Sequence, residues 1–446
     1  MKSLRMVTFG CKANQYDTQL LREALGRRGM EEAGEGAELV VINTCTVTAD
    51  AGRKARKLIR RIHRKNPDSK VAVTGCLAES EPEVLRSMPG VEWVLGNGEA
   101  KRPANFLRHL GFERDPEELG VPAGITEFAG HTRAFVKIQD GCDHACSFCI
   151  IPSVRGASRS RTSPELCAEV RELVQAGHAE VVLCGIHIGH WGREWGLSLG
   201  DLLADLVALD PRDDEDKPLD YRLRLSSIEA TEVDETLLAV MVAHPQRVAP
   251  HLHMPLQSGS ATVLQRMNRW YDPSEYVAAC DRIRSSLDRP AFTADVLVGF
   301  PAETDSEFEE TLALAAEVEF ARLHVFPFSA RPGTPAWDLA HEQGAAVPPP
   351  VVRERRAQLS EQAHTLGEDF RRSLDGARER VILEGFSGLS GRYQRVRVES
   401  RLLPDGPLPS SVDVILQARE RNSGDPQTLS AVELLGIPIC GSTPGK

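Results

Sequence analysis

Three cysteines with the spacing C-x3-C-x2-C form the strongest chemical motif of the chain. Cys142, Cys146 and Cys149 lie in GCDHACSFC, directly after a strand-like run at 134–139. Three thiolates on one short loop can hold three irons of a 4Fe–4S cluster, which normally takes four ligands, so that the fourth iron can bind a substrate. Structural zinc with His144 as a fourth ligand is the alternative, but such sites usually contain two ligand pairs. Because no second pair follows, the motif favours an iron–sulfur cluster.

A second set of cysteines is spread over the first hundred residues. Cys11, Cys45 and Cys76 each stand at the end of a strand-like run, and 34 and 31 residues separate them. In a parallel sheet the carboxyl ends of the strands share one edge, where ligands bind. A single cysteine after a strand is usually a small buried hydrophobic residue. Three of them at equivalent positions instead favour one shared metal centre with soft ligands.

An alternation of strands and helices must position this second set. Strand-like runs lie at 4–11, 39–45, 70–76 and 91–96, and helical patterns lie at 17–28, 50–65 and 79–88. Such an alternation predicts βαβ units and a parallel sheet. We place the resulting N-terminal domain at 1–102, and a linker rich in Pro, Gly and Glu at 103–132.

The C-x3-C-x2-C loop belongs to a second block of alternating elements. Its strand-like runs are 134–139, 181–188, 221–227, 251–257, 292–300 and 323–329, and its helical segments are 164–176, 199–209, 234–243, 260–269, 274–287 and 305–319. Six βα units are two fewer than a closed eight-stranded barrel contains. We therefore predict an open partial barrel over 133–350, with its chemistry at the carboxyl ends of the strands.

The remainder of the chain begins after the proline-rich break AVPPPV. A basic helix is predicted at 351–374, and β-type runs follow at 378–385, 393–400, 412–418 and 429–436. Short β-runs with Gly and Pro turns predict a small β-barrel of the oligonucleotide-binding type, which we place at 375–440. The predicted fold is thus α/β, with an N-terminal parallel-sheet βαβ domain, a central open partial (βα)6 barrel and a small C-terminal β-barrel.

The composition sets limits on the function. The 446 residues include 53 Lys and Arg against 64 Asp and Glu, a net charge of −11, and 41% of them are hydrophobic. These values are typical of a soluble globular protein and exclude a collagen-like, disordered or membrane-spanning chain. The negative net charge argues against indiscriminate binding of nucleic acid. Ten cysteines are too few for a disulfide scaffold and 1–10 lacks a signal-peptide pattern, so we expect a cytoplasmic protein with reduced thiols.

One local cluster of positive charge departs from the acidic total. The segment 53–65 contains eight Lys and Arg residues and no acid. On a helix, one stripe of this segment would consist of Arg53, Lys57, Arg60 and Arg64. A charge run is commonly only a solvated helix face, but its position after Cys45 favours contact with phosphates. Further candidates for guiding an RNA are Arg155, Arg159 and Arg161.

The cysteine loop, with Phe148 directly before its last cysteine, resembles that of the radical S-adenosylmethionine (SAM) enzymes. Within this superfamily the chain is similar to the methylthiotransferases over nearly its whole length. Segments that resemble their N-terminal domain are TFGCKANQYDT (8–18), INTCTVT (42–48) and VTGCLAE (73–79). Segments that resemble their barrel are HLHMPLQSGS (251–260), DVLVGFPAETDSEF (295–308) and LHVFPFSARPGTPA (323–336). The last block is similar to their TRAM domain, and NQYDT most resembles the branch that acts on threonylcarbamoyladenosine in tRNA.

The resemblance implies a set of cofactors and a reaction. The C-x3-C-x2-C cysteines would ligate the 4Fe–4S cluster that binds SAM, and a second 4Fe–4S cluster with one open iron would be ligated by Cys11, Cys45 and Cys76. One SAM would donate a methyl group to sulfur on the second cluster, and another would yield the radical that abstracts hydrogen from C2 of the adenine ring. The expected partners are a tRNA anticodon stem-loop and a small electron-transfer protein of the flavodoxin or ferredoxin type, with no membrane and no DNA.

Residues near the ends of the barrel strands are candidates for binding SAM. These candidates, with the aromatic residue of the cysteine loop, are Phe148, Gly185, Glu229, Gln257, Asp295 and Gly299. Glycines let the backbone approach a ligand closely, and Glu229 or Asp295 could accept hydrogen bonds from the ribose or amino group of SAM. A turn or packing role is the alternative for each of them. His251 and His253 share one face of their strand, directed to the barrel interior or serving a structural role.

Other functions remain open at the level of the sequence. They include a methylthiotransferase that acts on isopentenyladenosine in tRNA or on a ribosomal protein, and a zinc-containing RNA-binding protein without catalysis. Four cysteines without ligand spacing receive no site role, namely Cys167, Cys184, Cys280 and Cys440. Cys184 departs from the family branch, which more often has a hydroxyl residue there. Cys167 and Cys280 lie in helical segments and are expected to serve packing.

Overall fold

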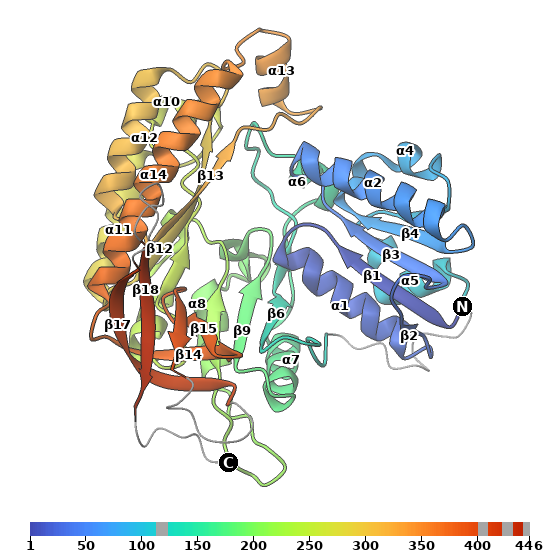
Figure 1. Ribbon diagram of the computed structural model, residues 1–446, viewed down its shortest axis with the longest axis horizontal. Coiled ribbons are helices and arrows are strands. Elements are labelled where there is room, and N and C mark those ends of the chain that lie inside the picture. The colour runs from blue at the N-terminus through green and yellow to red at the C-terminus, as the bar shows by residue number, and fades with distance from the viewer. Residues whose placement is uncertain (113–123, 400–408, 422–430, 440–446) are drawn as a thin grey trace.

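The computed structural model describes residues 1–112, 124–399, 409–421 and 431–439. It contains an N-terminal sheet domain, a central partial barrel beside it, and a small barrel at the foot of the long helix α14 (Pro349–Ser373) (Figure 1). This arrangement confirms the predicted α/β architecture. None of the described helices is both long and apolar enough to cross a membrane.

The N-terminal domain contains a five-stranded parallel sheet with the order β2-β1-β3-β4-β5. Its strands are β1 (Ser3–Thr8), β2 (Glu31–Glu32), β3 (Leu39–Thr44), β4 (Lys70–Gly75) and β5 (Val91–Leu95). The central strand β3 reads LVVINT and is buried along its whole length, as expected for a parallel strand covered by helices on both faces. Only the two-residue β2 was not predicted from the sequence.

Helices cover both faces of this sheet. One face packs against α1 (Lys12–Gly26) and α5 (Pro103–His109), and the other against α2 (Ala49–Lys65), α3 (Cys76–Ser80) and α4 (Pro82–Arg86). Helix α1 begins directly after Cys11 rather than at residue 17, because the polar side chains of its first turns are buried and hydrogen-bonded instead of forming a loop. The predicted helix 79–88 is divided, since Pro82 begins a new helix.

The central part contains all six predicted strands, arranged as two three-stranded parallel sheets with the orders β10-β9-β6 and β11-β12-β13. Their bounds are β6 (Arg133–Lys137), β9 (Glu180–Cys184), β10 (Arg222–Leu225), β11 (His251–His253), β12 (Ala291–Val298) and β13 (Arg322–Pro327). A parallel bridge between Ser227 and His253 joins the two sheets. No pairing among the described residues joins β6 to β13, so the barrel is open, as predicted.

The barrel helices pack around one large apolar core on the outside of the strands. They are α7 (Ser163–Gln175), α8 (Leu199–Val207), α9 (Glu235–Ala243), α10 (Ala261–Arg266), α11 (Pro273–Ser286) and α12 (Asp305–Val318). Capping boxes begin four of them, at Thr162, Ser198, Asp272 and Thr304. Short elements that were not predicted are β7 (Gln139–Asp140), β8 (Arg159–Ser160), α6 (Ile151–Arg155), α13 (Pro335–His341) and the 3-10 helices η3 (Ile188–His190) and η5 (Ala230–Glu232).

The small C-terminal domain is a closed barrel with the strand order β14-β15-β16-β18-β17. Its strands are β14 (Arg378–Glu384), β15 (Ser387–Ser390), β16 (Arg395–Val398), β17 (Ser411–Arg421) and β18 (Ala431–Pro438). The sequence predicted four of these strands and missed the short β15. Two buried arginines of β10 hold this domain to the central part: Arg222 donates to the carbonyl oxygen of Arg380 at 2.7 Å, and Arg224 donates to that of Gly391 at 2.8 Å.

Candidate functional site

The C-x3-C-x2-C loop is fixed by hydrogen bonds to three different segments. The amide of Cys142 donates to the carbonyl oxygen of Gly156 at 3.0 Å, and the amide of Ser147 donates to that of Met267 at 2.9 Å. The carbonyl oxygen of Ser147 accepts in turn from the amide of Ala336 at 2.9 Å. The three cysteines are therefore held in place before any cofactor binds.

Each sulfur of this loop faces a nitrogen. The backbone amide of Ile151 donates to Cys149 Sγ at 3.4 Å, and Arg269 Nη1 donates to Cys146 Sγ at 3.4 Å. Cys142 Sγ lies 3.7 Å from His187 Nδ1. Hydrogen bonds to ligating sulfurs are a principal means by which proteins tune iron–sulfur clusters.

The three loop thiols are better suited to ligating a metal cluster together than to reacting singly. All three are free, and burial raises the pKa of Cys149 to about 12 and raises that of Cys146. A thiol that burial keeps protonated becomes a thiolate when a metal supplies the compensating positive charge. Three gathered thiols with N–H groups directed at their sulfurs therefore fit the 4Fe–4S cluster predicted from the motif.

The N-terminal cysteines come together at the carboxyl edge of their sheet. Cys11 is exposed, whereas Cys45 and Cys76 are buried. Thr44 and Gly75, which precede Cys45 and Cys76, are paired in neighbouring strands, and Gly10, which precedes Cys11, lies against Cys45. Burial raises the pKa of Cys45, and the neighbouring Cys76 and Cys11 add to this effect. Their sulfurs also accept hydrogen bonds, from the Val47 amide to Cys45 Sγ and from Asn97 Nδ2 to Cys76 Sγ, both at 3.5 Å.

Glycines allow the backbone turns that bring these cysteines together. Gly75 has φ +91°, and a Cβ there would lie 2.4 Å from Asn43 Oδ1 and from the carbonyl oxygen of Thr44. Gly10 has φ +103°, and a Cβ there would lie 2.8 Å from Cys45 Cβ. Only glycine adopts these conformations without strain.

A buried network of charges lies between the two cysteine sets. Asp17 of α1 pairs with Lys101 at 2.7 Å and with Lys137 of β6, while Arg155 pairs with Asp140 at 2.7 Å. Burial raises the pKa of Asp17, but the surrounding cations outweigh it and lower that pKa to about 2. The pair between Asp17 and Lys137, together with Arg155 Nη2 at 3.7 Å from Asp17 Oδ2, connects the N-terminal domain to the barrel.

This network corrects one prediction. Arg155, predicted to contact RNA, is only 3% exposed and donates to Asp140 and Asn14. Its guanidinium is thus committed to the domain interface, and the prediction of an RNA contact is wrong for this residue. Arg161 is also largely buried, with 19% of its side chain exposed, and it donates to Glu169 and Tyr16. Arg159 alone of these three arginines is half exposed at its side chain.

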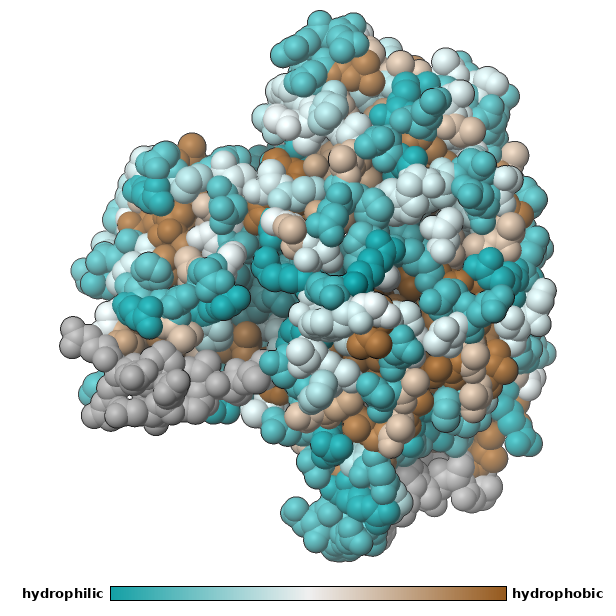
Figure 2. Space-filling view, turned by 180° about the vertical axis from the view of Figure 1, so that it is seen from behind, coloured by the Kyte–Doolittle hydropathy of each residue, from teal (hydrophilic) through white to brown (hydrophobic). Residues whose placement is uncertain are grey.

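The predicted stripe on α2 lies at the surface. The side chains of Arg53, Lys57, Arg60 and Arg64 are exposed, and the opposite helix face is buried through Ala55, Ile59 and Ile62. Arg53 pairs with Asp50, whereas Lys57, Arg60 and Arg64 have no ion-pair partner within the described part of the chain. Hydrophilic residues also predominate where the N-terminal domain meets the rest of the chain (Figure 2).

A cavity of about 290 Å³ lies within the partial barrel. Residues of both sheets, of the N-terminal domain and of the small C-terminal barrel line it, among them Lys12, His253, Asp295, His324 and Tyr393. Tyr393, at φ +62°, stacks on His251 with ring centroids 4.5 Å apart. The face that carries His251 and His253 is therefore directed to this interior, where both rings contact Thr293 Oγ1.

The candidates for SAM binding lie in different surroundings. Asp295 is partly exposed in the cavity, 3.5 Å from His253 Nε2, whereas Glu229 is buried and paired with Arg269. Gln257, at φ +64°, pairs through its backbone with Asp295 and Leu297. Phe148 packs against the barrel core.

The two glycine candidates have packing reasons of their own. A Cβ at Gly185 would lie 2.9 Å from the carbonyl oxygen of Gln139, and one at Gly299 would lie 2.5 Å from Val352 of α14. The close approach predicted at these glycines is thus made to the protein itself, and SAM contact there stays a prediction.

The cysteines without ligand spacing behave as expected where the structure describes them. Cys184 ends β9 in the core and Cys280 is buried in α11, while Cys167 of α7 is half-buried beside Ser163. Cys440 lies outside the described residues.

Sequence reasoning missed two residues of the site. Lys12 directly follows Cys11, and Arg269 follows α10, yet each reaches a site formed by distant segments. Their positions next to a cysteine and next to a barrel helix gave no sign of these contacts.

Comparison with known proteins identifies the family. A model described as uncharacterized protein family UPF0004 matches residues 3–96, and a model of the radical SAM superfamily matches residues 136–315. The threonylcarbamoyladenosine tRNA methylthiotransferase MtaB of Thermotoga maritima is 36% identical over 393 residues, covering 86% of this chain and 87% of that protein. The protein of the same name from Bacillus subtilis is 39% identical, covering 75% of each.

A solved structure supports the fold alone. The radical SAM methyltransferase TsrM from Kitasatospora setae, solved with cobalamin and a 4Fe–4S cluster bound, aligns with a TM-score of 0.54 at 16% identity, over 77% of this chain and 78% of that one. The sequence relatives, by contrast, match at a level that defines a family. This chain belongs to the threonylcarbamoyladenosine tRNA methylthiotransferases of the radical SAM superfamily.

Proposed function

We propose that this enzyme inserts a methylthio group at C2 of the adenine ring of threonylcarbamoyladenosine next to the tRNA anticodon. One SAM serves as methyl donor and a second as the radical source. When bound, the cluster at Cys142, Cys146 and Cys149 supplies the electron that cleaves SAM, and a second cluster in the N-terminal domain carries the sulfur. The observation that carries this proposal is the presence of two separate three-cysteine sets, both at the carboxyl ends of parallel strands.

The residues between the two sets support transfer from one to the other. Asn97 Nδ2 donates to Cys76 Sγ at 3.5 Å and to the carbonyl oxygen of Val154 at 2.8 Å, so one amide group connects the N-terminal cysteines to the segment after the barrel loop. Asp17 adds buried ion pairs across the same boundary, with Arg155 and with Lys137. Such contacts hold the two cysteine sets in fixed positions relative to each other. A reaction with steps at both sets requires such fixed positions.

The cavity in the barrel favours a substrate with a carboxylate. Threonylcarbamoyladenosine carries one, whereas the isopentenyl substituent is apolar. Lys12 lines the cavity and has no ion-pair partner within the described residues, while the nearby Arg224 is neutralised by Glu180. We assign Lys12 to the substrate carboxylate, because a charge-assisted hydrogen bond is roughly twice as strong as a neutral one. Asp295, which lines the same cavity, and Gln257, whose amide donates to the carbonyl oxygen of Asp295, are assigned to SAM.

In this proposal, exposed Lys and Arg side chains bind the tRNA. The stripe of α2 follows the loop that contains Cys45, and Arg159 follows the barrel loop, so both would contact phosphates near the reacting nucleotide. In the small C-terminal barrel, Phe386 is 55% exposed and available for stacking, whereas Tyr393 is used in the cavity. We further propose that the enzyme acts in the cytoplasm and takes electrons from a small flavodoxin or ferredoxin.

The proposal assigns one role to each part of the chain. Residues 1–102 would hold the second cluster, and residues 133–350 would hold SAM and its cluster. Residues 103–132 were predicted as a linker, but α5 (Pro103–His109) packs against the N-terminal sheet, so the connection would begin after it. The helix at 351–374 would connect the barrel to the small barrel placed at 375–440, which would bind RNA.

Mass spectrometry of tRNA nucleosides tests this function. A strain without the gene should lack methylthio-threonylcarbamoyladenosine and accumulate threonylcarbamoyladenosine, and the wild-type gene should restore the modified form. Undiminished methylthio-threonylcarbamoyladenosine would sink the proposal. If methylthiolation is lost from isopentenyladenosine or from a ribosomal protein instead, the enzyme acts on that substrate and belongs to another branch of the family.

The substitution Lys12→Leu tests the substrate assignment. It should raise KM for an anticodon stem-loop with threonylcarbamoyladenosine about 10-fold, as expected for the loss of one charge-assisted contact of ~1.4 kcal/mol. The release of 5′-deoxyadenosine without RNA should be unchanged. An unaltered KM would show that the carboxylate binds elsewhere.

A further inference from the structure

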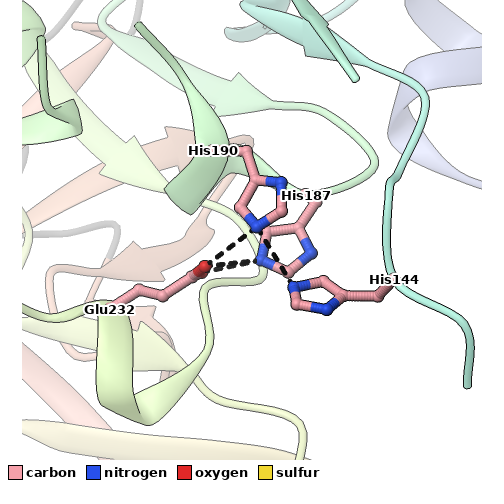
Figure 3. A group of neighbouring side chains, drawn as sticks. All are labelled: His144, His187, His190 and Glu232. Atoms are coloured by element: carbon pink, nitrogen blue, oxygen red, sulfur yellow. Dashed lines mark hydrogen bonds and ion pairs between the residues drawn. The ribbon is translucent and has the colours of Figure 1, made fainter. Parts of the chain in front are cut away.

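Four side chains beside the barrel loop converge on one point. His144 comes from the cysteine loop, His187 and His190 from the segment after β9, and Glu232 from η5 after β10 (Figure 3). One ligand atom of each lies within 4.8 Å of those of the other three. His187 and His190 are 7% and 4% exposed, so this convergence is built into the interior.

Three of the six separations between these atoms lie near the edge length of a coordination tetrahedron. His144 Nε2 and His190 Nε2 are 3.1 Å apart, His190 Nε2 and Glu232 Oε1 are 3.4 Å apart, and His187 Nε2 is 2.8 Å from Glu232. Zinc binds histidine nitrogen at 2.0–2.1 Å, so two ligands of a tetrahedral site stand about 3.3 Å from each other. Three of the six separations thus lie near this value and the other three are within 4.8 Å, so a central ion can contact the four atoms after the group contracts around it.

Hydrogen bonds alone leave this group poorly satisfied. His190 Nε2 faces both His144 Nε2 and Glu232 Oε1, and its single hydrogen cannot be directed at both. A metal ion at the centre would accept lone pairs from all three imidazoles at once and remove the competition.

The surroundings favour this arrangement of the four ligands. A Cβ at Gly189 would lie 2.0 Å from Glu232 Oε2, so glycine is what lets the carboxylate approach. The His144 ring stacks on Trp270 with centroids 3.4 Å apart and planes 7° apart, which fixes its orientation. If His187 Nε2 ligates an ion, its Nδ1 carries the hydrogen and faces Cys142 Sγ, and Arg193 donates to Glu232 at 3.1 Å. Such outer contacts orient metal ligands.

We propose that His144, His187, His190 and Glu232 form a closed site for one divalent transition-metal ion, zinc in the first place. Three imidazoles and a carboxylate suit zinc, and four protein ligands are typical of a structural rather than a catalytic site. The ion would tie the loop between Cys142 and Cys146 to the segments after β9 and β10. This site goes beyond the methylthiotransferase reaction and does not depend on it.

X-ray absorption at the zinc edge tests the site in the complete enzyme. The wild-type protein, with both clusters assembled anaerobically, is incubated with Zn²⁺ and freed of loosely bound metal, and its zinc and iron are then measured. We expect one zinc per chain with only nitrogen and oxygen ligands, at about 2.0–2.1 Å. Absence of retained zinc, or zinc with sulfur ligands at about 2.3 Å as in cluster-free cysteine sites, would overturn the proposal.

Substitutions separate this site from nonspecific binding. His190→Ala and Glu232→Gln should each lower the affinity for Zn²⁺ at least about 10-fold while the iron content stays that of the wild type. The matched control is His341→Ala, which removes an exposed histidine of α13 that stacks on Trp337. Equal zinc retention in the variants and the control would contradict the assignment. If the variants fold poorly, the ligand distances of the wild-type enzyme still decide it.

Discussion

The two cysteine sets differ in how the chain assembles them. The barrel set lies within one short loop. It takes a side-chain N–H donor from distant Arg269, and Cys142 Sγ faces Nδ1 of distant His187. The N-terminal set is gathered from the ends of three strands, and its donors are the Val47 amide and Asn97. A local loop can present its thiols even when its surroundings change, whereas a dispersed set exists only when its whole sheet has folded.

Removal of one set or the other should separate the two half-reactions, which is the largest effect expected. Changing Cys142, Cys146 and Cys149 together to alanine should leave about four of roughly eight irons per chain and abolish 5′-deoxyadenosine formation. Changing Cys11, Cys45 and Cys76 instead should also halve the iron but retain SAM cleavage. Iron analysis and chromatography of the nucleoside product measure both. Loss of all iron in either variant would show that the sets are not independent.

The dependence of the N-terminal set on its sheet can be tested at a glycine. Gly75→Ala would force a Cβ within 2.4 Å of two oxygens, in a conformation that also costs about 1–3 kcal/mol for a residue with a side chain. We expect about half of the iron to be lost, all of it from the N-terminal set. Gly29→Ala is the matched control, because Gly29 has φ +77° but open space around a Cβ. Similar iron loss in both variants would assign the effect to backbone strain alone.

The charged interface between the two regions should weaken in acid. Because the pKa of buried Asp17 is lowered to about 2 from its ordinary value near 4, its stabilising effect is present above pH 4 and is lost as the pH falls toward 2. Asp17→Asn should lower the stability of the interface by ~3 kcal/mol at neutral pH, and remove this acid dependence between pH 4 and 2. Chemical denaturation of the enzyme at several pH values measures it. An unchanged pH profile in the variant would contradict the role of Asp17.

The smallest expected effect concerns the surface of the N-terminal region. Replacing Lys57 and Arg60 by glutamine should weaken tRNA binding several-fold. It should also reduce the slope of log Kd against log salt concentration by the amount expected for about two lost phosphate contacts. The matched control changes Arg61 and Lys65, which lie on the same helix but pair with Glu35. Binding titrations at several salt concentrations measure the slopes. Equal slopes for the two variants would mean that α2 is only a solvated face.

Sequence patterns predicted the regular elements well and the contacts between them poorly. The six barrel strands and their helices follow from runs of apolar residues, and the polar caps at Thr162 and Asp272 mark helix starts. Strand β15 was missed because SGLS is too short and too polar to form a pattern. The start of α1 was missed because Asn14 finds partners in the carbonyl oxygens of Phe9 and Thr44, the latter thirty residues away.

The contacts between buried polar side chains could not be predicted from the sequence for a related reason. Arg155 reads as one of several surface arginines, and only the folded chain places it against Asp140 and Asn14. His144 and His190 are far apart in the chain and show no ligand spacing. Which charges are neutralised, and which imidazoles meet, depends on how separate segments pack, and no local periodicity records that.

The stacking of Tyr393 on His251 changes how the last domain should be regarded. A small barrel at the end of a chain resembles an appendage that could be exchanged or removed without harm to the rest. Here one of its side chains forms part of the wall of the interior cavity. Shortening the chain before β14 would therefore remove part of this wall and open the cavity to bulk water. The C-terminal domain and the partial barrel therefore form one structural unit, which protein engineering should keep together.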